Sequence, residues 1–425
     1  MMKVKTLYKI SLISIALVLL LVSSIASAAT AESVSPMITE TKITTSGSAR
    51  YPAIYGDKIV WEDRRNEYEN PNIYMYDLST KKETKITTNE SLPEFPAIYG
   101  DKIVWSDRRN SGSNPPTEIY MYDLSTSKES RISPSDYYSY WYLGFPKIND
   151  DKIVWQDWDG VDASNIHMYD LSTSTQVQIT FSGDAYGPDI YGDRVIYIDK
   201  RNRVYDIYMY DLSTQEEKKI ITSRLGSCPV IYEDRIVWQD QRNDNIENWN
   251  PDIYLYNLST SKETQITNSG SAHDPVIYGD RIVWVDCHND DWWGEGDIYM
   301  YDISTKKETQ ITTSGSAHDP VIYGDKIVWV DERNGYSDIY MCTISSVEPE
   351  PKLPIFPGYT NPPTDLNKDG LYEDINGNGE LDFDDVVACY DNMDWIEENA
   401  PVAFFDYNKN GLIDFDDIVK LYDML

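Results

Sequence analysis

The sequence predicts a mainly β protein: a seven-bladed β-propeller closed by an N-terminal strand, followed by a small α-helical module. Three observations predict this fold class. One sequence repeat occurs seven times, at spacings of 41 to 50 residues, which is the length expected of a four-stranded propeller blade. A strand that resembles the end of this repeat precedes the first copy. Two acidic, glycine-containing loops, each followed by an apolar segment, end the chain.

The N-terminus has the pattern of a signal peptide over residues 1–28. Three lysines among the first nine residues precede an apolar run from Ile10 to Val22, and Ala26-Ser27-Ala28 offers a small-residue cleavage site. The run is short for a membrane span, which needs about 20 apolar residues; an uncleaved anchor is the alternative. We therefore expect an exported, extracellular or cell-surface protein with no membrane span after cleavage.

Composition narrows the function classes. The net charge of −34 over 425 residues repels phosphate backbones, so we expect no nucleic-acid partner. The 34 tyrosines and 12 tryptophans favour a folded, β-rich protein. The four cysteines lie far apart without metal-ligand spacing, so free thiols are expected.

Each repeat contains four predicted strands. In the sixth copy they are Pro275–Tyr278, Arg281–Val285, Asp297–Tyr301 and Glu308–Thr312, with a tight turn at Gly279-Asp280. The second strand is almost wholly apolar, as expected of a strand buried on both faces between neighbouring blades. Its aromatic position falls at Trp61, Trp105, Trp155, Tyr197, Trp238, Trp284 and Trp329.

The last copy lacks its fourth strand, because Ile339–Cys342 leads into a proline-rich run. The missing strand stands at the other end of the chain: Thr41–Thr45 closely resembles Thr84–Thr88. We predict that it completes the seventh blade, closing a propeller over residues 38–346 and removing two open sheet edges. A linear stack of units is the alternative, and it leaves the displaced strand unexplained.

The repeats resemble those of TolB-type propellers, and most closely those of archaeal cell-surface proteins. Trp105–Asn110 and Ile119–Asp123 carry the resemblance, which covers about residues 40–345. It implies a propeller but no single function. TolB propellers are usually six-bladed, so the resemblance does not imply TolB's partner.

An Asp-Arg-Asn corner recurs after the second strand, for example at Asp63, Arg65 and Asn66. A catalytic role is one interpretation, but a group repeated in most blades fits turn capping and ion pairing between neighbours better. No nucleophile elbow, zinc-binding helix motif or phosphate loop is present. We therefore predict that the chain is not an enzyme; paired carboxylates for glycoside cleavage are the runner-up.

We expect the functional site at positions where the repeats differ. These lie on the face of the propeller that carries the connections before the first strand and after the second strand of each repeat. The residue before the first-strand proline varies most: Tyr51, Phe95, Phe145, Gly187, Cys228, Asp274 and Asp319. The pairs His273-Asp274 and His318-Asp319 occupy matching places in adjacent copies. They predict a polar or metal-binding patch, with simple hydrogen-bonded pairs as the alternative.

Aromatic insertions should lie on the same face. The candidates are Trp141, Trp158, Trp249, Trp292 and Trp293. Flat rings stack on sugars and provide contact area at low entropic cost, which predicts a glycan or protein ligand. Packing of these rings as loop plugs is the alternative.

Two C-terminal loops have the ligand spacing of a calcium hand, and we predict bound Ca²⁺. The ligand residues are Asp374, Asn376, Asn378, Glu380, Asp382 and Asp385 in the first loop, and Asp406, Asn408, Asn410, Leu412, Asp414 and Asp417 in the second. Position 7 supplies its carbonyl, and glycine at position 6 permits the sharp turn. Val386–Met393 and Ile418–Leu425 are predicted helices. Asp365, Asn367 and Asp369 form half of another loop, which with Glu373 makes a third site or a cap.

The duplicated loop–helix units, with Asp at position 12 and no helix before the first loop, resemble a type I dockerin over residues 365–425. The resemblance implies docking to a cohesin-like protein module. Dockerins often carry Ser or Thr at positions 10 and 11, where this chain has Phe383-Asp384 and Phe415-Asp416. A proline-rich linker, residues 347–364, joins this module to the propeller.

Together these features predict a secreted or cell-surface binding protein whose propeller recognises a glycan or surface protein and whose calcium-loaded tail docks it to a partner. One alternative is a dockerin-tethered, extracellular polysaccharide-degrading enzyme, a glycosidase or lyase. A structural protein of the cell envelope is the other.

Overall fold

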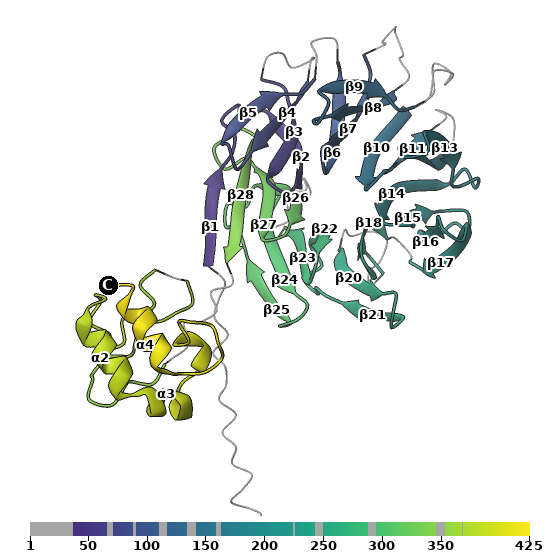
Figure 1. The fold of residues 1–425 in the computed structure, drawn as a ribbon. Coiled ribbons are helices and arrows are strands. Elements are labelled where there is room, and N and C mark those ends of the chain that lie inside the picture. Colours follow the sequence, from purple (N-terminus) through teal and green to yellow (C-terminus); the bar gives the residue numbers. More distant parts are fainter. Residues whose placement is uncertain are drawn as a thin grey trace, which may run out of the picture. The chain divides into compact units, whose positions relative to one another are not determined.

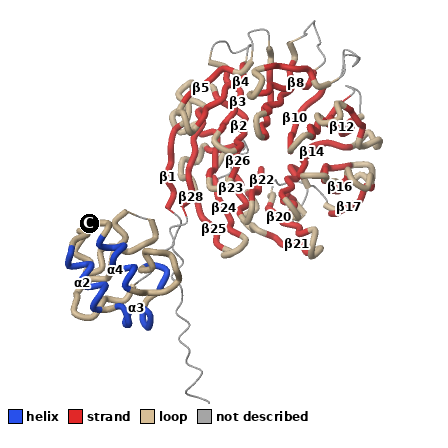
Figure 2. Tube along the Cα trace, viewed as in Figure 1, coloured by secondary structure: helices blue, strands red, loops and turns tan. Residues whose placement is uncertain are grey.

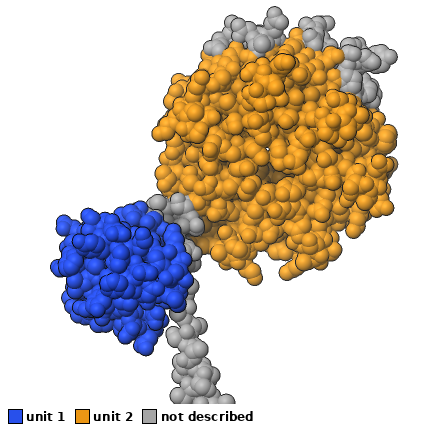
Figure 3. Space-filling view, viewed as in Figure 1, with its two compact units in different colours: residues 1–35, 346–425 blue, residues 36–345 orange. Residues whose placement is uncertain are grey.

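The computed structural model describes residues 37–65, 71–87, 91–109, 117–133, 142–158, 163–223, 226–242, 250–287, 295–345, 353–367 and 369–425. The chain divides into a propeller unit, residues 36–345, and a tail unit (Figure 3). The predicted signal peptide lies outside the described residues and stays a prediction. In the described part of the chain, no helix has the length and apolar character that a bilayer crossing requires.

Seven four-stranded antiparallel sheets form the propeller unit and follow one another around a ring (Figures 1 and 2), which confirms the predicted fold. The first three sheets are β2 (Ala49–Tyr55), β3 (Lys58–Asp63), β4 (Asn72–Asp77) and β5 (Lys82–Lys85); β6 (Pro93–Tyr99), β7 (Lys102–Asp107), β8 (Glu118–Asp123) and β9 (Lys128–Arg131); and β10 (Tyr142–Asn149), β11 (Lys152–Trp158), β12 (Ser164–Asp170) and β13 (Thr175–Gln178).

The remaining four sheets continue in chain order, and the last takes its outer strand from the N-terminus. They are β14 (Ala185–Tyr191), β15 (Arg194–Asp199), β16 (Asp206–Asp211) and β17 (Glu216–Ile221); β18 (Ser227–Tyr232), β19 (Arg235–Asp240), β20 (Asp252–Asn257) and β21 (Lys262–Gln265); β22 (Ala272–Tyr278), β23 (Arg281–Asp286), β24 (Asp297–Asp302) and β25 (Lys307–Gln310); and β26 (Ala317–Tyr323), β27 (Lys326–Asp331), β28 (Asp338–Ser345) and β1 (Met37–Lys42).

The second strand of each blade is buried on both faces, as its composition predicts. Ile59 and Trp61 of β3 pack in a cluster with residues of blade seven, while Val60 points the other way and packs against blade two. The aromatic residue of this strand is at most 1 % exposed in every blade. It stacks on a ring of the third strand, for example Trp61 on Tyr74 at a centroid distance of 6.1 Å.

The outermost strand ends earlier than predicted, because Ile311 and Thr312 both donate to the Ile298 carbonyl and a side chain, not the backbone, accepts from the Ile298 N–H. In blade six, β25 ends at Gln310, whereas the prediction runs to Thr312. The Thr312 hydroxyl accepts a hydrogen bond from the Ile298 backbone N–H (2.9 Å) and donates one to Asp297 (3.0 Å). The strand therefore ends while the Ile298 N–H keeps a hydrogen-bond acceptor.

The N-terminal strand closes the ring, as predicted. β1 pairs antiparallel with β28, from Met37 opposite Ser345 to Lys42 opposite Tyr340. The strand therefore begins before the predicted Thr41–Thr45. Thr44 follows it and ties the two ends together: its buried hydroxyl accepts from the Ile339 N–H and donates to Asp338, both at 2.9 Å.

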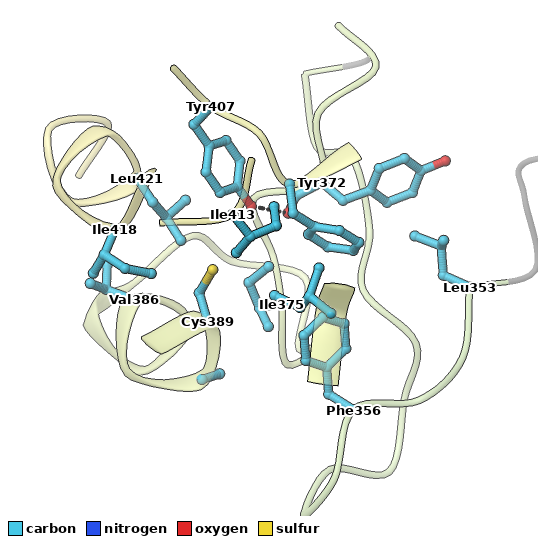
Figure 4. Packing of buried hydrophobic residues seen from close by; sticks show 13 residues of the cluster. Leu353, Phe356, Tyr372, Ile375, Val386, Cys389, Tyr407, Ile413, Ile418 and Leu421 are labelled. Atoms are coloured by element: carbon cyan, nitrogen blue, oxygen red, sulfur yellow. Dashed lines mark hydrogen bonds between the residues drawn. The ribbon is translucent and has the colours of Figure 1, made fainter. Parts of the chain in front are cut away.

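The tail unit has a small core of its own. It contains α2 (Phe383–Asp391), α3 (Met393–Asn399), a 3-10 turn (Val402–Phe404) and α4 (Phe415–Tyr422). Figure 4 shows Phe356, Ile375 and Tyr407 converging in the core, where Tyr407 Oη donates to the Tyr372 carbonyl at 2.6 Å. Leu353 and Phe356, inside the predicted linker, are buried here, so this part of the linker packs with the tail.

Both predicted helices begin three residues earlier than expected, because the loops carry their own caps. The Asp382 side chain accepts from the Asp384 N–H, and Asp385 accepts in return from the Asp382 N–H, a capping box. Asp414 and Asp417 repeat this arrangement at the start of α4. The short helix α3 and the 3-10 turn were not predicted.

Replacing Thr44 with valine tests the closure. Thr44→Val leaves the buried Ile339 N–H without its acceptor and removes one of the hydrogen bonds to Asp338, so we expect the free energy of unfolding to fall by about 1–3 kcal/mol. Urea unfolding of the full chain, followed by tryptophan fluorescence, measures this change. The exposed neighbour serves as the control: Thr45→Val should stay within about 0.5 kcal/mol. Equal effects of the two substitutions would contradict the assigned role of Thr44.

Candidate functional site

The first strand of every blade contains a β-bulge at the variable position found in the sequence. The pairing of this strand with the second shifts register there in all seven blades. The bulge residues all have positive φ, between 49° and 60°: Tyr51, Phe95, Phe145, Gly187, Cys228, Asp274 and Asp319. Left-handed backbone costs a non-glycine residue about 1–2 kcal/mol. Six blades nonetheless keep a side chain at this position.

These side chains form a ring around the axis, since the first strands of successive blades contact one another all the way round. One part of the ring is aromatic: the Tyr51 and Phe95 rings lie 4.7 Å apart, and Phe95 and Phe145 lie 4.5 Å apart. Phe145 is 45 % exposed, although it belongs to an innermost strand. The propeller surface is hollowed near its centre in the space-filling view (Figure 3). The exposure of Phe145 makes the aromatic part of the ring accessible.

The opposite part of the ring is polar. The Cys228 thiol donates to Asp274 at 3.6 Å, and each predicted histidine pairs with the aspartate that follows it. Nδ1 of His273 lies 3.1 Å from Asp274, and Nδ1 of His318 lies 3.3 Å from Asp319. Burial lowers the pKa of His273, but its hydrogen bonds with Asp274 and Cys287 outweigh burial and raise the pKa to about 9. The polar half thus consists of hydrogen-bonded His–Asp pairs.

A cleft of about 300 Å³ adjoins the ring between blades three and four. Trp158, the last residue of β11, lines it and is 44 % exposed. Tyr186 faces the same cleft with a buried hydroxyl that has no hydrogen-bond partner, and the Lys200 ammonium lies 4.5 Å from the centre of the Tyr186 ring. An exposed indole beside polar and cationic groups suits a polar ligand.

The other predicted aromatic residues cannot be placed in this way. Trp141, Trp249, Trp292 and Trp293 lie outside the described residues, and their role in ligand binding stays a prediction.

Two acid–base pairs beside the aromatic half were not singled out from the sequence. Glu62 is fully buried and accepts from Arg64 at 2.8 Å, and Arg108 pairs in the next blade with Glu94. Burial raises the pKa of Glu62, although Arg64 opposes the shift. The sequence contains a signal for these pairs at the residue that follows the repeated corner aspartate. This residue is arginine in the first two blades and a different residue in each of the other five: Arg64, Arg108, Trp158, Lys200, Gln241, Cys287 and Glu332.

The repeated Asp-Arg corner is structural. Asp63 accepts from the Trp61 indole (2.9 Å) and from the backbone and side chain of Arg65 (2.9 and 2.8 Å). Arg65 continues to Glu83 on the outer strand of the same blade and lies over the Tyr74 ring. Burial alone would raise the pKa of Asp63, but the bonds from Arg65 and Trp61 lower it. The ion pairs of this corner therefore lie within a blade, whereas the sequence interpretation placed them between neighbours.

Tyrosines surround the axis at the other end of the first strands. Neighbouring rings of this set lie 4.6 to 5.0 Å apart: Tyr55, Tyr99, Tyr191, Tyr232, Tyr278 and Tyr323. Blade three has Asn149 instead, and Tyr99 Oη donates to the adjacent Asp150 at 2.7 Å. The two ends of the axis therefore differ in chemistry.

The two acidic loops of the tail have the same internal geometry. Asp374, at position 1, accepts from the backbone N–H groups of Asn378 (2.9 Å) and Gly379 (2.8 Å). Asp406 makes the equivalent contacts at 3.0 and 2.7 Å. The glycines at position 6 have φ of +90° and +86°, which a side chain would disfavour.

The acid at position 12 folds back onto each loop. Asp385 accepts from the N–H of Asn376 (3.1 Å) and of Asp382 (2.8 Å), and Asp417 repeats both contacts. Asp374, Asp385 and Asp417 are fully buried. Burial raises the pKa of Asp385, and the nearby charges of Asp374 and Asp382 add to the shift. This concentration of buried negative charge fits a divalent cation held by oxygen ligands.

The half-loop upstream also brings acids together. Among the described residues, ligand oxygens of Asp365, Asp369 and Glu373 lie within 4.8 Å of one another. Asn367 donates to Glu373 rather than joining this set as an oxygen ligand. Burial raises the pKa of Glu373, helped by the charges of Asp365 and Asp369. This acidic group is a possible metal site, as the sequence allowed.

The tail helices expose an apolar face with two matching halves. Phe383, Val387 and Tyr390 on α2 correspond to Phe415, Val419 and Tyr422 on α4, and all six side chains are exposed. The halves cross-pair edge to face: Phe383 with Tyr422 and Tyr390 with Phe415, each at 6.3 Å. The phenylalanines at position 10 of the loops thus form one continuous aromatic surface.

No family model and no curated protein matches this sequence. Solved structures do match. An oligogalacturonate lyase in complex with manganese is 13 % identical, with a TM-score of 0.55 over 74 % of this chain and 97 % of that chain. The propeller domain of the Trilobed protease from Pyrococcus furiosus is 11 % identical, with a TM-score of 0.53 over 70 % of this chain and 95 % of that chain.

A TolB-like propeller of Agrobacterium tumefaciens also matches, 14 % identical, with a TM-score of 0.44 over 65 % of this chain and 99 % of that chain. The lyase and the protease propeller confirm the propeller fold and nothing finer. The closer resemblance to repeats of archaeal cell-surface proteins stays a prediction.

Proposed function

We propose that this chain is an exported binding protein whose propeller ring captures a glycan or surface protein and whose tail docks it, once calcium-loaded, to a cohesin-like partner. The observation that carries the proposal is the duplication in the tail. Two loops with calcium-hand spacing share one set of hydrogen bonds, and the helices that follow them share one exposed aromatic face. A metal-ordered module with an exposed face suits docking.

Calcium would be held by the side-chain oxygens of the two loops. The two position-12 aspartates are central to this role, because each is buried and already turned toward the backbone of its own loop. Bound calcium would offset the repulsion between the buried carboxylates of each loop. The upstream acidic group, Asp365, Asp369 and Glu373, is proposed as a third metal site.

Calorimetric titration of the metal-stripped full chain tests this assignment. We expect at least two calcium ions to bind, and affinity to fall as the pH is lowered, because protons compete with calcium for the Asp385 carboxylate, whose pKa is raised. Asp385→Asn combined with Asp417→Asn should abolish binding at both loops. Asp391→Asn, an exposed acid on α2 with the same charge change, should bind normally. Normal binding by the double variant would refute the assignment.

The docking surface is proposed to be the aromatic face of α2 and α4. Its six apolar side chains are contiguous and solvent-exposed, which is unusual for a surface that contacts nothing. The loops fix the starts of both helices through their capping boxes, so metal binding and the presentation of this face are coupled. Phenylalanine at position 10 would select a partner with an apolar docking surface.

A pull-down with purified cohesin modules, with calcium or with a chelator, tests the docking proposal. We expect calcium-dependent retention of the full chain. Phe383→Ala with Phe415→Ala should weaken retention at least about tenfold, since exposed aromatic anchors dominate such interfaces. Phe181→Ala, an exposed phenylalanine on the propeller, is the control. Retention that survives the double substitution would exclude this face, and no retention by any cohesin would remove the partner class.

The propeller ligand is proposed to bind at the ring of bulge residues and the adjoining cleft. Aromatic rings of Tyr51, Phe95 and Phe145 offer a stacking surface, and Trp158 continues it into the cleft. Hydroxyl-rich ligands would hydrogen-bond to the polar half of the ring. A polysaccharide-degrading activity is the second candidate, supported by the buried carboxyl group of Glu62, whose pKa is raised, beside this surface.

An array of microbial and plant cell-wall polysaccharides probes this site. We expect the full chain to bind at least one polymer, and Phe95→Ala with Phe145→Ala to weaken binding at least about tenfold. Tyr422→Ala, an exposed aromatic of the tail, should have no effect. Failure to bind any polysaccharide would leave a protein ligand, to be sought by cross-linking at the cell surface. Chain shortening of a bound polymer that stops in Glu62→Gln would favour the enzyme.

A further inference from the structure

Three side chains of blade six form a line of thiol, imidazole and carboxylate. Nε2 of His273 lies 3.2 Å from Sγ of Cys287, and Nδ1 of His273 lies 3.1 Å from Oδ2 of Asp274. His273 is buried, whereas Cys287 is only partly buried. All four cysteines are free, so Cys287 is available for chemistry.

The fold fixes this line through two neighbouring strands. His273 directly precedes the bulge of β22 and pairs across the ladder with Val285 of β23, and Cys287 follows the last residue of β23. The bulge residue Asp274 turns back to Nδ1, and its backbone N–H is fixed by Gln239 at 2.8 Å. The imidazole is therefore held from both sides.

This arrangement directs the second imidazole nitrogen at sulfur. With the Nδ1 proton held by Asp274, Nε2 either accepts the thiol proton or, when protonated, donates to the sulfur. Proton transfer from Sγ to Nε2 gives a thiolate–imidazolium pair, and Asp274 stabilises its positive member. Thiolate, and not thiol, is the nucleophile.

We propose that Cys287 is an activated nucleophilic thiol, assisted by His273 and oriented by Asp274, that captures disulfides at the polar half of the ring. The thiolate attacks one sulfur of the disulfide, a new S–S bond to Cys287 forms, the original S–S bond breaks, and the second sulfur leaves as a thiolate. The exchange consumes no external oxidant or reductant. The proposal does not depend on the glycan or protein ligand.

The groups around the Cys287 thiol oppose one another in their effect on its protonation. The Glu295 carbonyl oxygen lies 2.8 Å from Sγ and favours the protonated thiol, whereas His273 favours the thiolate. Asp274 also contacts the Cys228 thiol and interacts with His318, which pairs with Asp319; Glu295 adds negative charge near His318. The rate of exchange reports the balance of these groups.

Blade seven provides a natural control, because it has the same histidine and aspartate without the thiol. His318 pairs with Asp319, and Glu332 stands where blade six has Cys287, with its carboxylate 3.9 Å from Nε2. Substitution at His318 therefore removes an equivalent His–Asp pair while the line in blade six stays intact.

The test measures the reaction of each thiol in the folded full chain with 5,5′-dithiobis(2-nitrobenzoate), resolved by peptide mass spectrometry. At pH 7 an ordinary thiol is only a few per cent thiolate, and at pH 6 about tenfold less. We expect Cys287 to react at least about tenfold faster than in His273→Gln, and Asp274→Asn to give an intermediate rate. His318→Gln should lower the rate far less than His273→Gln does. Circular dichroism and thermal melting confirm that each variant is folded.

The pH profile separates activation from mere accessibility. An activated Cys287 keeps its rate as the pH falls from 8 to 6, whereas in His273→Gln the rate should fall about tenfold per pH unit below about 8. Cys228, the exposed thiol, supplies the internal comparison. If Cys287 reacts with the pH dependence of an ordinary thiol, or if His273→Gln leaves its rate unchanged, the proposal is overturned.

Discussion

Burial of the second strand of each blade on both faces is the constraint on which the propeller depends. An Ile-Val-Trp strand places large apolar side chains on both sides, and each buried one contributes about 1.5–3 kcal/mol relative to exposure. Such a strand needs an apolar neighbour on each side. A linear array would leave its first and last blades half-covered, whereas the cluster joining Trp61 to Val328 and Val330 gives blade one the same surroundings as the others. In the same way, β28 needs a hydrogen-bonded strand on its outer edge, and the displaced strand β1 provides it.

The repeated scaffold leaves few positions free to differ, and these positions meet at one end of the axis. The bulge in each first strand turns one side chain out of the ladder and into the ring. Around this ring the chemistry changes from aromatic at Phe95 and Phe145 to thiol, imidazole and carboxylate at Cys228, His273 and Asp274. A ligand that meets the ring therefore meets an asymmetric surface, although the backbone around it is nearly seven-fold symmetric.

The number of blades, the closing strand and the two matching loops could be predicted from the sequence, because each depends on local pattern and repetition. The helix starts were missed because Asp382 and Asp414, predicted as loop ligands, also cap the helices, and the pattern was interpreted only as ligand spacing. Positive φ at Phe145 could not be inferred, since nothing in the residue type favours it. The contact between His273 and Cys287 depends on cross-strand register, and the unpaired Tyr186 hydroxyl depends on side-chain packing. Neither contact can be inferred from the spacing of residues along the sequence.

The order of strands in the closing blade has a mechanical consequence. The tail follows directly on β28, which lies between β1 and β27 and is hydrogen-bonded to both. Tension applied through a tethered tail therefore enters the propeller along a strand held on two edges, and it loads both ladders in shear, so many hydrogen bonds resist together. Had the chain ended on an outer strand such as β25, the same load would fall on one ladder. Closure by β1 thus gives the strand at the attachment point a hydrogen-bonded partner on each edge.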